Sequence, residues 1–220
     1  MMMSSLHPFT IFLIGGILAA LAPRRWGGII VLLTPAIGMV NLLAMDPGAE
    51  WRLDFLDYRL DLFRADKLAL LFGYLFHIAV FIGALFALHL RDRVQQTAAL
   101  LYGGSTIGAV FAGDLIVFFL FWEIAAVASV FLIWARRTER ALAAGMRYLI
   151  IQVVSGLLFF AGALLYIQET GSIAFDYIGL DGPASWLILI ALGIKCGFPL
   201  VHNWLTDAYP EATPTGTVFL

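Results

Sequence analysis

Charged residues and cysteine are scarce in this 220-residue chain. Only 13% of the residues are charged, whereas soluble globular domains carry about a quarter. The single cysteine, Cys196, excludes an intramolecular disulfide framework, and a small buried thiol is a simpler interpretation of it than a reactive one. The sequence also lacks a cluster of Cys, His and carboxylate residues with metal-ligand spacing, and it lacks a phosphate-binding glycine loop. We therefore expect no metal, no other cofactor and no nucleic-acid partner.

Apolar sequence is abundant, because 62% of the residues are hydrophobic. These residues fall into runs of about 20, the length that crosses a lipid bilayer as a helix. We expect an all-α integral membrane protein with about seven complete transmembrane helices and the start of an eighth near Thr213. The predicted segments are Leu6–Ala22, Trp26–Met45, Leu68–Leu90, Val94–Gly113, Leu115–Ala135, Met146–Ile167 and Ala184–Leu205.

The loop charges predict the orientation of these segments, because Lys and Arg gather in cytoplasmic loops. Basic residues follow the first, third and fifth segments: Arg24, Arg25, Arg91, Arg93, Arg136, Arg137, Arg140 and Arg147. The other connections are mainly acidic, with Asp46, Glu50, Asp54, Asp57, Asp61, Asp66, Asp114, Glu169, Asp176 and Asp181. Residues 1–8 lack the basic region of a signal peptide, so the first segment is expected to be retained. This predicts a multi-pass protein of the bacterial inner membrane with an extracytoplasmic N-terminus.

One connection, at about residues 46–66, is long. Between Glu50 and Phe63 it alternates apolar with charged side chains, for example Leu53 and Phe55 against Arg52. A period of two predicts a small extracytoplasmic hairpin, and an interfacial amphipathic segment is the alternative.

Two charged residues, Glu123 and Lys195, remain inside the predicted spans after the loop charges have been assigned. A charge at the centre of a membrane helix costs about 2.5–3.5 kcal/mol, so each residue is a candidate for function and needs a partner. The topology gives their segments the same direction, which places both residues at a similar depth. A carboxylate beside a lysine favours the protonated lysine, so neutralising or moving the acid releases a proton. The two residues therefore suggest a proton relay, and a static ion pair that fixes helix packing is the alternative.

The segment that contains Lys195 also carries signals for a helix break. Pro199 has no N–H, so the carbonyl of Lys195 loses its helical partner, and Gly193 and Gly197 flank the same point. A free carbonyl at membrane depth is tolerated only against protein or a water-filled cavity. We therefore expect a seventh helix that is broken at mid-membrane beside a hydrated site.

Two histidines are further candidates for the relay. His202 follows Lys195 by about two helical turns and lies on the same face if the helix resumes after its break. With an unperturbed pKa near 6.5 it could carry protons onward, or it could cap the interface beside Trp204. His77, in the middle of the third segment, is a secondary candidate, and a histidine that only satisfies a helix contact is its alternative.

These residues resemble the antiporter-like membrane subunit family, shared by Mrp-type cation/proton antiporters, respiratory complex I and membrane-bound hydrogenases. The resemblance covers about residues 98–220. It is carried by FWEIAAVAS, which contains Glu123, and by GIKCGFPLVHNWLTDAYPEATPTGT, which contains Lys195, His202 and Asp207. The run from Tyr209 to Ala212 is similar to the D-type chain of the Mrp antiporters and its relatives.

The resemblance implies a fold of about fourteen helices with two inverted repeats, each containing a broken helix. Residues 1–97 would form the N-terminal transmembrane helices with the hairpin loop, and residues 98–220 the first proton-conducting repeat. Leu220 ends inside an apolar run, so we expect this repeat to be incomplete and the sequence to be a fragment.

For function, the resemblance implies a subunit of a multisubunit Na⁺(K⁺)/H⁺ antiporter, with Glu123, Lys195 and His202 as the relay and Asp207 as a secondary residue. Its partners would be other membrane subunits, protons, monovalent cations and the lipid bilayer. Such a subunit is a transporter component and no enzyme on its own. A proton-pumping subunit of an NADH:quinone oxidoreductase or hydrogenase-type complex, and a non-transporting structural subunit, are the alternatives.

Overall fold

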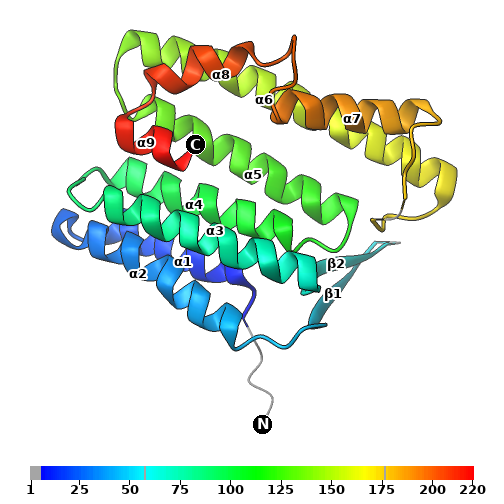
Figure 1. The fold of residues 1–220 in the computed structure, drawn as a ribbon, viewed down its shortest axis with the longest axis horizontal. Helices are drawn as coiled ribbons and strands as arrows, with labels where there is room; N and C mark the ends of the chain where they lie inside the picture. Colours follow the sequence, from blue (N-terminus) through cyan, green and yellow to red (C-terminus); the bar gives the residue numbers. More distant parts are fainter. Residues whose placement is uncertain (1–5, 57, 176) are drawn as a thin grey trace.

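The computed structural model describes residues 6–56, 58–175 and 177–220. Two acidic loop residues named above, Asp57 and Asp176, lie outside the described residues, as do residues 1–5. The described chain is mostly helical, and its long helices lie side by side along one direction (Figure 1). They are α1 (Pro8–Leu21), α2 (Arg24–Leu43), α3 (Lys67–Phe86), α4 (Arg93–Val110), α5 (Leu115–Trp134), α6 (Glu139–Thr170) and α7 (Pro183–Lys195). Shorter elements follow: α8 (Asn203–Ala208), the 3-10 turn η1 (Tyr209–Glu211) and α9 (Pro214–Phe219).

Four helices, α2, α3, α5 and α6, are long and apolar enough to cross a membrane. Helices α1 and α7 are apolar but shorter. α6 extends past its predicted segment at both ends, because Thr138 caps its start and Gly171, with φ 70°, ends it. α9 begins beside Thr213, where an eighth segment is expected. A helical membrane protein is therefore supported, and the number of complete spans stays a prediction.

Helix α5 occupies the middle of the arrangement. It packs against α4 on one side and α6 on the other, and α7 and α8 pack in turn against α6 (Figure 1). Small residues line the packed face of α5, including Ala125, Ala126, Ala128 and Ser129, which are all buried. Such residues let helix backbones approach closely in a membrane protein.

The long connection forms a β-hairpin, which decides between the two alternatives left by its alternating pattern. Strand β1 (Glu50–Phe55) pairs antiparallel with β2 (Tyr58–Arg64), and Arg52 forms an ion pair with Asp61 at 2.7 Å. Asp114, the N-cap of α5, accepts hydrogen bonds from the amides of Asp61 at 2.6 Å and Val117 at 2.8 Å. One buried carboxylate thus caps α5 and also fixes the hairpin at that end of the helices.

Helix α7 ends at Lys195, well before the predicted end of its segment at Leu205. Gly197 and Leu200 both adopt left-handed backbone, with φ values of 68° and 78°. Pro199 between them has no N–H with which to continue the helix. Helical structure returns only at Asn203, so Lys195 lies at a helix end inside the protein rather than in a continuous span.

Candidate functional site

Glu123 lies near the middle of α5, and its carboxylate packs against α6 at Gly156. A Cβ atom on residue 156 would overlap Oε1 of Glu123 and would lie 2.8 Å from its Cδ. The absence of a side chain at Gly156 is therefore what leaves room for the carboxylate. Oε1 of Glu123 is buried, and it has no hydrogen-bond partner within the described part of the chain. A buried acceptor of this kind is available to a further donor.

Lys195 approaches the same region from the end of α7. Its ammonium nitrogen lies 5.0 Å from the ring centroid of Trp122, the residue before Glu123, which is within the range of a cation–π interaction. Trp122 stacks on Phe159 of α6 with centroids 5.4 Å apart, so its ring is held in place. Among the described residues, Lys195 forms no ion pair with a carboxylate. The half-buried charged side chains of α5 and α7 thus approach the same region without an ion pair between carboxylate and ammonium.

Helix α6 adds polar side chains that the sequence reasoning missed. The hydroxyl of Tyr148 hydrogen-bonds Ser129 of α5 at 2.8 Å, and Ser155 donates to the carbonyl of Ala191 on α7 at 2.8 Å. Gln152 lies between them and is completely buried. In the sequence, Glu123 and Lys195 are conspicuous because they are charged residues inside apolar runs. Neutral polar residues inside apolar runs are a second signal, and that signal would have identified Gln152.

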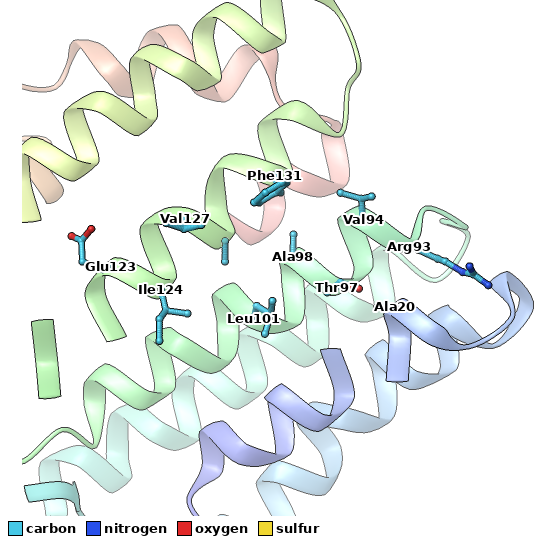
Figure 2. Close-up of a pocket in the computed structure, with 11 residues that line it drawn as sticks. Ala20, Arg93, Val94, Thr97, Ala98, Leu101, Glu123, Ile124, Val127 and Phe131 are labelled. Atoms are coloured by element: carbon cyan, nitrogen blue, oxygen red, sulfur yellow. The ribbon is translucent and has the colours of Figure 1, made fainter. Parts of the chain in front are cut away.

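A cavity of about 650 Å³ lies beside the site, between α1, α4 and α5 (Figure 2). Its walls are mainly apolar, with Leu101, Ile124 and Phe131 among the lining residues. Glu123 and Arg93 lie at opposite ends of the cavity (Figure 2). The cavity, with its mainly apolar walls, therefore reaches the edge of the charged site.

Residues 112–220 match the family described as NADH:quinone oxidoreductase/Mrp antiporter, transmembrane region. This part of the chain belongs to that family.

Curated proteins similar to this antiporter-like chain include both kinds of protein that the family description names. A putative antiporter subunit mnhA2 of Staphylococcus haemolyticus is 31% identical, over 87% of this chain and 27% of the relative. NADH-quinone oxidoreductase subunit N of Methylococcus capsulatus is 32% identical, over 73% of this chain and 36% of the relative. Across eight such relatives the match spans between 24% and 48% of the relative's length. This chain therefore corresponds to less than half of the proteins it resembles.

A solved structure shares the fold of the antiporter-like chain. The membrane-bound sulfane sulfur reductase, an archaeal respiratory membrane complex, contains a chain with a TM-score of 0.81 and 23% identity. The similarity covers 96% of this chain and 37% of that one. At this identity the likeness establishes the fold of a multi-pass membrane subunit and nothing about activity.

The spacing argument for His202 does not hold in this antiporter-like chain. Residues 196–202 are not helical, so His202 is not carried onto the Lys195 face by a continuing helix, and its side chain is exposed. The neighbouring Trp204 is buried instead and donates its indole N–H to the carbonyl of Ile194 at 2.9 Å. This bond ties the start of α8 to the last turn of α7. A relay role for His202 stays a prediction.

The two secondary candidates, Asp207 and His77, both bond to groups other than Glu123 and Lys195. Asp207 on α8 accepts two hydrogen bonds of 2.7 Å from Arg147 near the start of α6, and this bonding lowers the pKa of the carboxyl below its ordinary value. His77 is completely buried on α3, where it hydrogen-bonds the carbonyl of Gly73 at 2.7 Å and packs edge-on against Phe12. Asp207 thus joins α8 to α6, and His77 belongs to the packing of α1 and α3.

Proposed function

We propose that this chain is part of a proton-translocating subunit of a multisubunit Na⁺(K⁺)/H⁺ antiporter, in which Glu123 and Lys195 exchange a proton. One observation supports this most directly. Lys195 ends α7, its ammonium group lies over the ring of Trp122 beside Glu123, and within the described part of the chain it forms no ion pair. A static pair for helix packing would bring the two charges into contact, whereas a relay needs them close and separable.

In the proposed cycle, the charge state of the Glu123 carboxylate controls whether Lys195 keeps its proton. With the Glu123 carboxylate charged, the protonated form of Lys195 is favoured by attraction across the helix interface and by the Trp122 ring. When Glu123 accepts a proton, that attraction is lost and Lys195 releases its own proton toward the non-helical segment at residues 196–202. Because the two groups do not touch, water carries the proton between them. His202 then receives the proton, or water passes it onward.

The proposed setting follows from the family and from the loop charges. The partners are other membrane subunits, and the protons and monovalent cations move through the assembled complex. The Arg-rich connections face the cytoplasm, so the N-terminus and the β-hairpin lie outside it, in a bacterial inner membrane. Residues 98–220 form the first proton-conducting repeat, preceded by the N-terminal helices of residues 1–97.

A second candidate function is a proton-pumping subunit of a redox-driven complex. It is favoured by the curated relatives, which include NADH-quinone oxidoreductase subunits M and N as well as the antiporter subunit. Neighbouring genes for quinone or iron–sulfur subunits would favour this function, and neighbouring antiporter genes the first. A non-transporting structural subunit is the third possibility, and it requires that Glu123 and Lys195 be dispensable for transport.

The experiment that tests the proposal replaces Lys195 with alanine in the full-length protein, within its complete complex. We expect exchange to fall by about 100-fold or more, which is the contribution of a proton-transferring group, with membrane insertion intact. Lys67→Ala is a matched control, because Lys67 is the other lysine of the sequence and is exposed at the start of α3. Exchange retained by the Lys195→Ala complex would refute the relay.

A further inference from the structure

Gln152 stands out among the polar side chains of α6, because it is completely buried and its amide has no partner in the part of the chain that the structure describes. Neither Nε2 nor Oε1 of this side chain has a hydrogen-bond partner in the described residues. Its polar neighbours on α6 are satisfied, since Tyr148 is bonded to Ser129 and Ser155 to the carbonyl of Ala191. A buried amide without partners is rare, because desolvation is then not compensated. The amide therefore requires a bound partner of small size.

Gln152 lies close along the helices to both charged residues, Glu123 and Lys195. It lies one helical turn from Gly156, the residue that contacts the Glu123 carboxylate. Helices α6 and α7 run antiparallel, as contacts of Gly162 with Ala184 and of Ser155 with Ala191 show. Lys195 follows Ala191 by about one turn of α7. Because α6 runs in the opposite direction, the residue level with it lies about one turn before Ser155, at Gln152. Gln152 is therefore level with Lys195 and one turn from Glu123.

Two further unpaired groups lie in the same region. The indole N–H of Trp122 is buried without a partner in the described chain, and so is Oε1 of Glu123. Trp122 is the ring that Lys195 approaches, so these atoms come from α5 and the amide from α6. A polar region with several unsatisfied donors and acceptors is the kind of site that holds ordered water.

We propose that Gln152 binds water between Glu123 and Lys195 and so positions the proton transfer. The inference rests on the function proposed above. A glutamine amide both donates and accepts but does not titrate, so it can orient a water molecule without taking its proton. After Lys195 has released its proton, the protonated Glu123 carboxyl gives its proton to the water oxygen, and the water gives another proton to the neutral Lys195 amine. The acid ends as a carboxylate, lysine ends protonated, and the water is regenerated.

The test measures cation/proton exchange by the complete complex carrying Gln152→Leu or Gln152→Asn. Leucine removes the amide at similar volume, and we expect exchange to fall about tenfold with normal assembly. Asparagine keeps the amide one methylene shorter and should restore most of the rate. Gln95→Leu is the matched control, because Gln95 is equally buried but is bonded to Thr215 away from the charged site.

The results separate this inference from the proposed function. Normal exchange by Gln152→Leu, or equal losses for leucine and asparagine, would overturn the role of the amide even if Lys195→Ala is inactive. Retained exchange by Lys195→Ala would instead overturn the relay itself. If Gln152→Leu does not assemble, a high-resolution map of the wild-type complex decides. Water within hydrogen-bond distance of the Gln152 amide supports the inference, and an amide bonded only to protein overturns it.

Discussion

The contact between Gly156 and Glu123 makes Gly156→Ala an informative perturbation. The added Cβ would overlap Oε1 of Glu123 and lie 2.8 Å from Cδ, so the carboxylate has to turn away from α6. Overpacking costs about 1–3 kcal/mol, and replacing glycine by alanine inside a helix returns about 1 kcal/mol. The net loss of about 0–2 kcal/mol in the free energy of unfolding leaves the protein folded.

The effect on transport should be larger than the effect on stability. A displacement of the carboxylate by about 1 Å can lower the rate of a positioned reaction about 100-fold. We therefore expect exchange by reconstituted complexes carrying Gly156→Ala to fall between about tenfold and 100-fold, measured with a pH-sensitive dye inside vesicles. Gly16→Ala is the control, because the new Cβ in α1 would make only ordinary contact, 3.4 Å from Leu101.

A compensating change sharpens the test of this contact. Aspartate at position 123 is one methylene shorter, so adding Glu123→Asp to Gly156→Ala should recover part of the lost exchange. Wild-type exchange by Gly156→Ala would refute the reasoning, because the Glu123 carboxylate would then not need its present position. Equal losses for Gly16→Ala and Gly156→Ala would also refute it, since the effect would then be general to membrane glycines.

Two further predictions concern the ends of the helices. Asp114→Ala removes the acceptor for the amides of Asp61 and Val117. Hydrogen exchange at the Asp61 amide should therefore become faster, and the free energy of unfolding should fall by about 1–2 kcal/mol. An unchanged exchange rate at Asp61 would contradict this. Arg147 lowers the pKa of Asp207, so their contact stabilises the fold above the ordinary carboxyl pKa and is lost as pH falls through the lowered value. Arg147→Gln should thus lower the melting temperature at pH 7 but not in acid below that value, and a pH-independent difference would show that another interaction is lost.

The sequence predicted those parts of the fold that depend on local chemistry. Apolar runs predicted the long helices, because a bilayer demands about 20 such residues. The break after Lys195 depends on Pro199 and Gly197, whose backbone effects are local. The alternating stretch before Arg64 forms the expected strands for the same reason, since its period of two belongs to a strand.

The site itself depends on packing that no local pattern contains. The packing of helices against α5 decides that Glu123 lies against Gly156 and that the ring of Trp122 lies beside Lys195. The place of His202 depended on the helix resuming at once, and the left-handed backbone at Leu200 prevents that. Asp114 meets an amide 53 residues earlier in the chain, a distance over which periodicity carries no information.

The measurement that tests the central claim most directly is exchange by the complete complex carrying Lys195→Met, beside one carrying Lys67→Met. Methionine removes the charge while roughly preserving the size of the side chain, so packing at the end of α7 is retained. The proposed relay predicts a complex that assembles normally and does not exchange protons for cations, with full exchange in the Lys67→Met control. Normal exchange by the Lys195→Met complex would contradict the relay and would leave a structural role for this subunit.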